Sequence, residues 1–190
     1  MLAPSGLPIV TARLVLRPPE GSDAQALLAI FSDPEVTRYW ATPPWTTTEQ
    51  AVARIEQDRK NLDEGSAVSL VLQPADGGAI LGRVALFAFV EGSQRAELGY
   101  ILARHAWGKG LNHEALRAFL GYGFSKLALR RVEADIDPRN ERSARTLERL
   151  GFTREGYLRE RWVVGGEVSD TVLYGLLSKD WYATQAQREA

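Results

Sequence analysis

The sequence contains no cysteine, and this absence removes several kinds of chemistry at once. Disulfide bonds, cysteine nucleophiles and cysteine-ligated metal sites are all excluded. Histidine is scarce as well, because His105 and His113 are the only two and neither belongs to an HExxH motif. We therefore expect no metal site.

The chain also lacks long apolar runs and a strong net charge. No stretch approaches the length that crosses a membrane, and the first ten residues lack the basic flank and long apolar centre of a signal peptide. The formal net charge of -1 provides no global field to hold nucleic acid or an anionic membrane. We expect a cytoplasmic protein that binds neither of them directly, so any anion site must be local.

The length and composition suit one compact domain. The 190 residues are 45% hydrophobic and 25% charged, which is an ordinary range for soluble proteins, and no internal repeat or linker tract interrupts them. We expect a single domain over residues 1–190, with residues 1–8 flexible.

The most informative stretch is Trp107-Gly108-Lys109-Gly110, where a short apolar strand runs into an amphipathic helix. The two glycines let backbone N–H groups converge without Cβ interference, so an anionic group can lie at the positive end of the helix. A Walker loop needs Lys and then Ser or Thr after its second glycine, and a dinucleotide fingerprint needs a third glycine where His113 stands. The junction predicts a phosphate-binding turn of another kind, with a purely structural tight turn as the alternative.

Hydrophobic periodicity and turn residues predict an α+β order around one mixed sheet. The expected strands cover residues 13–17, 67–73, 79–90, 96–102 and 132–137, followed by a closing hairpin about Gly165-Gly166. The expected helices cover residues 23–33, 46–63, 112–126 and 142–150. The prolines of segment 39–45 make it an aromatic-rich loop.

This order, with the glycine loop between the fourth strand and the third helix, resembles the GCN5-related N-acetyltransferase (GNAT) fold over almost the whole chain. Three segments sharpen the resemblance toward the branch of the ribosomal-protein N-terminal acetyltransferases RimJ and RimL. They are TARLVLR near the N-terminus, DPRNERSARTLERLGF from Asp137 to Phe152, and REGYLRE from Arg154 to Glu160. The resemblance implies a mixed, mostly antiparallel sheet of about seven strands flanked by about four helices, splayed between strands four and five.

The resemblance also implies acetyl-CoA as co-substrate, without a metal. In the family an (Arg/Gln)-x-x-Gly-x-(Gly/Ala) loop binds the pyrophosphate, but here Trp107 and Asn112 replace its first and last members, which puts the side-chain contacts in doubt and not the loop. An opened strand and an Asn-x-x-Ser pair hold the remainder of the molecule. The expected binding residues are Leu98, Gly99, Tyr100, Ile101, Trp107, Gly108, Lys109, Gly110, Leu111, Asn112, Asn140 and Ser143.

Four of these residues have a structural alternative that the sequence leaves open. Gly99 could mark a β-bulge and Lys109 could be a solvated loop charge. Asn140 could be a helix N-cap, and Ser143 a first-turn residue that needs no function.

Direct acetyl transfer needs a neutral amine and a proton for the departing thiolate, but no protein nucleophile. Many family members place a tyrosine acid in the helix over residues 142–150, and Leu147 occupies that place here. Ser143, or a water that it holds, is therefore the candidate acid. Glu97 matches a carboxylate of this branch and is the candidate base; its alternative is an outward strand residue paired with a basic neighbour.

The acceptor pocket that the resemblance implies is built from the first helices, their connecting loop and the last hairpin. Aromatic rings could shape a slot for a peptide N-terminus or a small amine, although such rings more often pack. The principal candidates are Arg17, Tyr39, Trp40, Tyr157 and Trp162, with Arg38, Trp45, Arg159 and Glu160 beside them.

The sequence therefore predicts an acetyl-CoA-dependent amine N-acetyltransferase. The expected acceptor is a protein N-terminal α-amine, and the alternative is a polyamine, an antibiotic or an amino-acid derivative. A non-catalytic acyl-CoA sensor, which Leu147 favours, and a nucleotide-binding module, which the failed motifs disfavour, are the rival classes. The family also suggests a homodimer.

Overall fold

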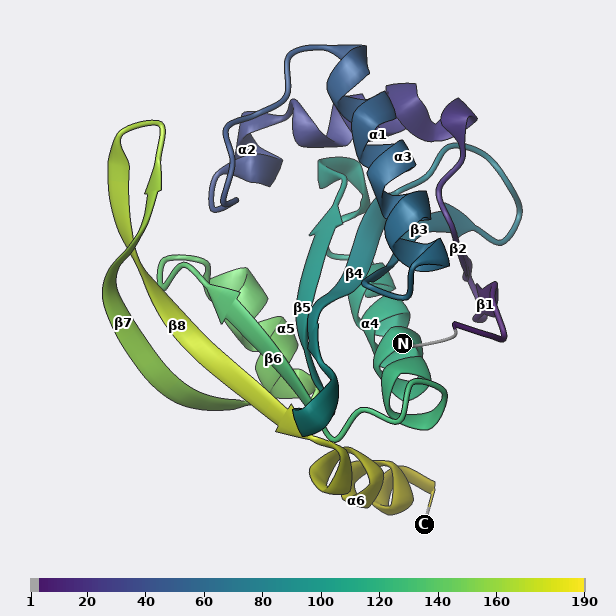
Figure 1. Cartoon of the computed structure of the whole chain (residues 1–190), viewed down its shortest axis with the longest axis vertical. Helices are drawn as coiled ribbons and strands as arrows, with labels where there is room; N and C mark the ends of the chain where they lie inside the picture. The colour runs from purple at the N-terminus through teal and green to yellow at the C-terminus, as the bar shows by residue number, and fades with distance from the viewer. Residues whose placement is uncertain (1–3, 190) are drawn as a thin grey trace.

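The computed structural model describes residues 4–189, which form a mixed sheet of eight strands with helices on both faces (Figure 1). Part of the segment expected to be flexible, residues 1–3, lies outside the described residues. The strands are β1 (Ile9–Val10), β2 (Leu14–Arg17), β3 (Val68–Pro74), β4 (Gly82–Val90), β5 (Arg95–Leu102), β6 (Arg131–Ile136), β7 (Thr153–Val164) and β8 (Glu167–Leu177). The helices are α1 (Ala24–Phe31), α2 (Pro34–Thr37), α3 (Thr48–Asp63), α4 (Leu111–Ser125), α5 (Glu141–Arg149) and α6 (Ser178–Glu189), and 3₁₀ turns cover η1 (Gly21–Asp23), η2 (Glu91–Ser93) and η3 (Arg104–Ala106).

The strands lie side by side in the order β1-β2-β3-β4-β5-β6-β8-β7. Every neighbouring pair is antiparallel except β5 and β6, which are parallel and pair solely through residues 95–97 and residues 131–133. Beyond this short contact the two strands separate, and the rest of β5 faces a gap. The predicted splay in the sheet is confirmed.

The ladder between β4 and β5 fixes which backbone groups of β5 face the gap. Ala103 N–H donates to Leu81 O over 2.7 Å, so these residues form a hydrogen-bonded pair. Such pairs alternate along an antiparallel ladder, so Ile101 and Gly99 turn their N–H and C=O groups toward β4. The groups that face the gap are those of Leu98, Tyr100 and Leu102.

Two apolar clusters lie on opposite faces of the sheet. The larger one packs α4, α5 and α6 against the strands through buried residues such as Phe119, Leu147 and Trp181. The smaller one packs α1 and α3 against the other face and includes Phe31 and Ile101. Because side chains alternate along a strand, Glu97 and Gly99 share the α1–α3 face with Ile101, and Tyr100 shares the α4–α5 face with Leu98.

The predicted helices and strands are all present, with bounds within three residues, and the structure adds three elements. The short strand β1 pairs with β2, α2 begins at Pro34 where the first helix was expected to end, and α6 follows β8 directly. The sheet therefore has eight strands instead of about seven, and six helices flank it instead of about four. In Figure 1 the hairpin of β7 and β8 extends beyond the body of the molecule.

Candidate active site

The glycine loop joins η3 to α4 in the conformation that the sequence predicts. Gly108 and Gly110 both have φ of +75°, which L side chains rarely adopt, and Gly110 is the N-cap of α4. Among the described residues, no acceptor bonds the N–H groups of residues 108–110, and all three residues are exposed. The positive end of α4 is thus open to an anion, as a diphosphate requires.

Arg13 braces this loop from the start of β2. Its Nη1 donates to Lys109 O over 2.9 Å, and its Nε donates to Glu114 of α4 over 2.6 Å. Thr11 Oγ1 bonds the same carboxylate over 2.7 Å. Although burial opposes the change, these hydrogen bonds lower the pKa of Glu114 and keep it ionised. The TARLVLR segment therefore ties the loop to the sheet, a role that the sequence did not indicate.

Trp107 stands where the family carries a cation, and Arg142 of α5 supplies one beside it. The guanidinium carbon of Arg142 lies 4.8 Å from the centre of the Trp107 ring, within cation–π range. Trp107 Nε1 also donates to Leu102 O, a gap-side carbonyl, over 2.7 Å. Sequence reasoning missed Arg142 because its contact joins two segments that are distant along the chain.

Ser143 faces Tyr100 across the gap. Their hydroxyl oxygens lie 2.5 Å apart, and Ser143 is 8% exposed. Burial raises the pKa of Tyr100 to about 12, so its phenol is a neutral proton donor at physiological pH. Tyr100 was expected to contribute its backbone, and the structure adds its hydroxyl. Leu147 is fully buried and offers no proton donor.

Asn140 is the N-cap of α5, because its side-chain oxygen accepts a hydrogen bond from Ser143 N over 3.1 Å. The N-cap alternative for Asn140 is therefore confirmed, and its contact with the co-substrate stays a prediction that the side-chain Nδ2 permits. Gly99 pairs in regular register with Ala85, whereas the irregularity of this ladder lies between Phe87 and Val90. The β-bulge alternative for Gly99 is therefore wrong.

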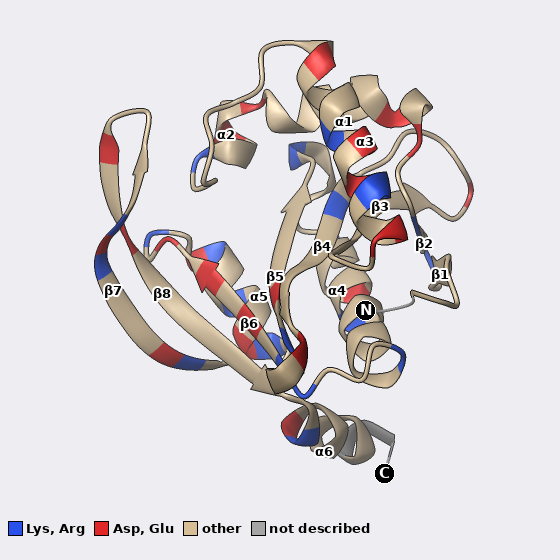
Figure 2. Ribbon diagram, in the orientation of Figure 1, with Lys and Arg blue, Asp and Glu red and all other residues tan. Residues whose placement is uncertain are grey.

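Glu97 lies on the opposite face of the gap among other carboxylates. It is in register with Glu133, and Asp135 follows two residues later on β6, where Figure 2 shows acidic residues. Burial raises the pKa of Glu97, and the negative charges of Asp135 and Glu133 raise it further. Arg95 pairs with Glu133 over 2.6 Å, and among the described residues Glu97 forms no ion pair, so the alternative in which it pairs with a basic neighbour is not supported.

Asp135 is a candidate site residue that the sequence analysis did not select. Burial raises its pKa, while a hydrogen bond from the side chain of Trp162 opposes the rise. Asp135 stands two residues after Glu133, on the same face of the strand, and this spacing was the available signal in the sequence. Its closeness to Glu97, however, depends on the pairing of β5 with β6. Trp162, a predicted acceptor residue, therefore lies beside Asp135. We call Glu97, Glu133 and Asp135 together the acidic group.

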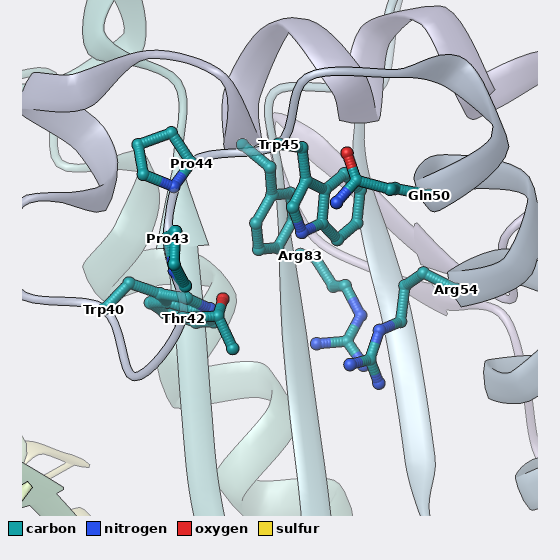
Figure 3. Close-up of a pocket in the computed structure, with 9 residues that line it drawn as sticks. Trp40, Thr42, Pro43, Pro44, Trp45, Gln50, Arg54 and Arg83 are labelled. Atoms are coloured by element: carbon teal, nitrogen blue, oxygen red, sulfur yellow. The ribbon is translucent and has the colours of Figure 1, made fainter. Parts of the chain in front are cut away.

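The other predicted acceptor residues lie in separate places. Trp40 and Trp45 line a pocket of about 290 Å³ between the loop over residues 40–45, α3 and β4 (Figure 3). The guanidinium carbons of Arg38 and Arg139 lie 5.4 and 5.7 Å from the centre of the Tyr39 ring.

The outer hairpin holds Tyr157, which donates a hydrogen bond to Asp170. Glu160 bonds the same carboxylate through its backbone N–H over 2.7 Å, and Arg159 interacts with it electrostatically. Arg17 lies on β2, three strands from β5, and its guanidinium makes two hydrogen bonds of 2.8 Å to Asp23. Because that ion pair occupies it, we leave Arg17 out of the acceptor pocket.

Among the side chains that the structure describes, no group of three or more His, Asp or Glu residues could hold a metal ion. Within residues 4–189, every helix is too short or too polar to cross a membrane.

Comparison with known proteins identifies the family. The family model described as Acetyltransferase (GNAT) domain matches residues 13–153. The chain belongs to the GNAT family. This acetyltransferase is 35% identical over 175 residues to the uncharacterized N-acetyltransferase p20 of Bacillus licheniformis, which covers 91% of this chain and 97% of that protein.

Two further relatives are informative. The acetyltransferase is 31% identical over 181 residues to the ribosomal protein uS5 alanine N-acetyltransferase of Escherichia coli strain K12, covering 91% of this chain and 92% of that protein. It shares the fold of the spermidine N-acetyltransferase from Vibrio cholerae in complex with CoA and spermine, with a TM-score of 0.80 and 22% identity over 90% of this chain and 99% of that one.

The acetyltransferase is thus an amine N-acetyltransferase of the RimJ/RimL-like branch, and acetyl-CoA is its co-substrate. The residues present fit that molecule, because exposed amides at the glycine loop suit a diphosphate and gap-side amides of β5 suit a thioester oxygen. The sensor and nucleotide-binding alternatives are not retained.

Proposed function

We propose that the acetyltransferase modifies the N-terminal α-amine of a protein or peptide by direct attack on the thioester of acetyl-CoA. The observation that carries this proposal is the gap between β5 and β6, which has Glu97 on one face and Ser143 with Tyr100 on the other. The E. coli relative, whose name specifies an alanine of a ribosomal protein, supports this acceptor class.

Three groups of residues bind three parts of acetyl-CoA. The backbone of residues 107–112 binds the diphosphate, with Arg142 as an added cation, and Asn140 bonds the pantetheine arm through Nδ2. The N–H groups of Leu98 and Tyr100 receive the thioester oxygen. Gly99 and Ile101 were expected to bind in the same way, but their backbone groups face β4, so in the proposal they shape the strand instead.

The two faces of the gap carry the two proton transfers. Glu97 takes a proton from the incoming ammonium, directly or through a water, because only the neutral amine attacks. The C–N bond forms as the C–S bond breaks, and Ser143 passes a proton from Tyr100 to the thiolate. The extra proton on the new amide nitrogen returns to the Tyr100 phenolate through Ser143, and Glu97 releases its proton to water, so that both groups are restored.

A small polycationic amine is the second candidate acceptor. The carboxylates of Glu97, Glu133 and Asp135 lie together on the acceptor face, which favours a cation. The spermidine N-acetyltransferase from Vibrio cholerae has the same fold.

A screen of amines with acetyl-CoA tests the proposal. Peptides with free and blocked N-termini, spermidine and aminoglycosides are compared, and products are identified by mass. We expect acetylation of free peptide N-termini; acetylation of spermidine with inert peptides would favour the second candidate. CoA binding in calorimetry without transfer to any amine would contradict the proposal. A homodimer, a cytoplasmic location and the absence of nucleic-acid binding stay predictions.

A further inference from the structure

The pocket lined by Trp40, Trp45, Gln50, Arg54 and Arg83 presents hydrogen-bond donors to any ligand (Figure 3). Gln50 Oε1 accepts from the N–H groups of Thr46 and Thr47 over 2.7 and 3.1 Å, which leaves Nε2 on the side of the pocket. Arg83 donates to neighbouring side chains through Nε and Nη2, and its Nη1 has no hydrogen-bond partner in the part of the chain whose side chains are described.

The charges around this pocket do not balance. Arg83 is bonded to Asp58 of α3 over 2.6 and 2.7 Å, and Arg54 lies 3.7 Å from the same carboxylate. Two guanidinium groups therefore share one carboxylate, which is 1% exposed. A second anion would offset the remaining positive charge, and planar guanidinium groups suit a carboxylate or a phosphate.

The pocket lies on the acceptor face of the sheet. Arg83 is directly opposite Ile101 in the ladder, and both side chains point to the α1–α3 face that also carries Glu97. From Arg83, Glu97 lies four residues along the strands and one strand across, and Asp135 lies two residues along and two strands across. At about 3.3 Å per residue and about 4.8 Å per strand, these separations are roughly 12–14 Å.

We propose that this pocket binds an anionic group of the acceptor, so that the preferred substrate carries a carboxylate or phosphate on about the third or fourth residue, counting the residue with the acetylated amine as the first. The inference rests on the proposed function, since it takes the acidic group at the gap as the place of the amine. The ammonium end then meets Glu97 and Asp135, and the anionic end meets Arg54 and Arg83. The aromatic rings of Trp40 and Trp45 cover the connecting chain.

Matched peptides test the inference. Hexapeptide amides are prepared in pairs that carry either Glu or Gln at position 2, 3, 4 or 6, with uncharged side chains elsewhere. The rates of acetylation of the two members of each pair are compared. We expect KM to be about tenfold lower with Glu than with Gln at position 3 or 4, the size of one charge-assisted hydrogen bond, and equal at position 6. The variant Arg54→Gln should abolish the preference, so that KM for each Glu peptide becomes equal to that for its Gln counterpart in the same variant.

Lys60→Gln is the control, because it removes a charge from α3 at a site that is 66% exposed and outside the pocket. The pair 8-aminooctanoate and octylamine carries the same comparison to small molecules, and an Arg54-dependent preference in either series supports the inference. Equal KM for Glu and Gln peptides and for the small pair, or a preference that survives Arg54→Gln, overturns it.

A binding measurement separates this inference from the proposed function. Glutarate should change the fluorescence of the pocket tryptophans, whereas glutaramide, which has the same length and no charge, should not. The dissociation constant for glutarate should rise about tenfold in Arg54→Gln, while that for acetyl-CoA stays constant. Failure of peptide acetylation with intact glutarate binding contradicts the acceptor class and leaves the anion pocket; no Arg54-dependent glutarate binding contradicts the pocket itself.

Discussion

Glu97 is a carboxylate in surroundings that favour its neutral form. Burial raises its pKa first, the charges of Asp135 and Glu133 raise it further, and Arg95 and Arg161 act in the opposite direction. A carboxyl whose pKa is higher in the folded than in the unfolded chain binds extra protons when folded, so stability declines as pH rises through the raised pKa. The residue proposed as the base therefore destabilises the fold in its working form.

The variant Glu97→Gln should separate these two effects. We expect it to be more stable than the wild type at pH 8 and equal to it below about pH 4, where both side chains are neutral. Its kcat should fall by about 10²-fold or more, and the loss of activity at acidic pH should disappear from its profile. Urea unfolding at the two pH values and a pH–rate profile measure these outcomes, with exposed Glu56→Gln as control. A stability loss at pH 8 would contradict this account.

Tyr100 and Ser143 act in the proposal as one unit, because their hydroxyls are hydrogen-bonded. Tyr100→Phe and Ser143→Ala should each lower kcat by about 10- to 100-fold, and the double variant should lose little more than either single one. The affinity for CoA should stay constant, as measured by calorimetry. Tyr182→Phe on α6, whose ring is 50% exposed, is the control. Fully multiplicative losses would show that the two hydroxyls act independently.

Several site residues could be predicted from the sequence, and others could not. The loop glycines follow from a short local motif, and Glu97 and Ser143 were selected through the resemblance to the family. Arg13, Arg142 and Asp135 gain their roles from contacts between segments that are distant along the chain, so no local pattern marks them.

At the scale of elements, the N-cap glycine of α4 and a glycine inside the helix have opposite roles. Gly110 holds φ of +75° at the N-cap, whereas Gly121 lies inside the helix, where an added Cβ would meet Trp181 at an ordinary 3.8 Å. The same substitution should therefore have opposite effects at the two ends of one helix.

Gly110→Ala should lower the free energy of unfolding by about 1 kcal/mol and weaken CoA binding, because a left-handed conformation strains alanine. Gly121→Ala should raise it by about 0.5–1 kcal/mol and leave CoA binding unchanged, because alanine favours a helix interior. Chemical denaturation and calorimetry on both variants provide the comparison. Equal effects on CoA affinity would show that the loop conformation does not determine binding.

The elements that the sequence missed are those with weak local signals. Strand β1 has two residues and exists through its pairing with β2. In α2, Pro34 was interpreted as the end of a helix, but Asp33 accepts from Glu35 N and caps a new one. Helix α6 is mostly polar, and Trp181 anchors it beside Phe124 with ring centres 5.8 Å apart, a contact that only the fold reveals.

At the scale of the whole molecule, a buried ion pair fastens the α1–α3 layer to the sheet. Asp58 of α3 is 1% exposed and binds Arg83 of β4, whose Nη2 also donates to Ser69 of β3 over 2.8 Å. A single helix residue thus connects to two strands in the interior.

Asp58→Ala should lower the free energy of unfolding by about 3–5 kcal/mol, because it leaves the Arg83 guanidinium buried without its partner. Asp63→Ala, at an exposed position of the same helix, should change it by less than about 0.5 kcal/mol. The double variant Asp58→Leu with Arg83→Met should recover much of the loss, since it removes both charges. Thermal and urea unfolding measure all three, and a mild effect of Asp58→Ala would contradict this role.

The parallel contact between β5 and β6 is three residues long, so it joins two parts of the sheet, which we call arms, at a single pivot. Five strands form one arm, three strands form the other, and the pivot is fixed at one end by hydrogen bonds. With the acyl group in the gap, as proposed, we expect a longer acyl chain to be accepted only when the two arms stand farther apart.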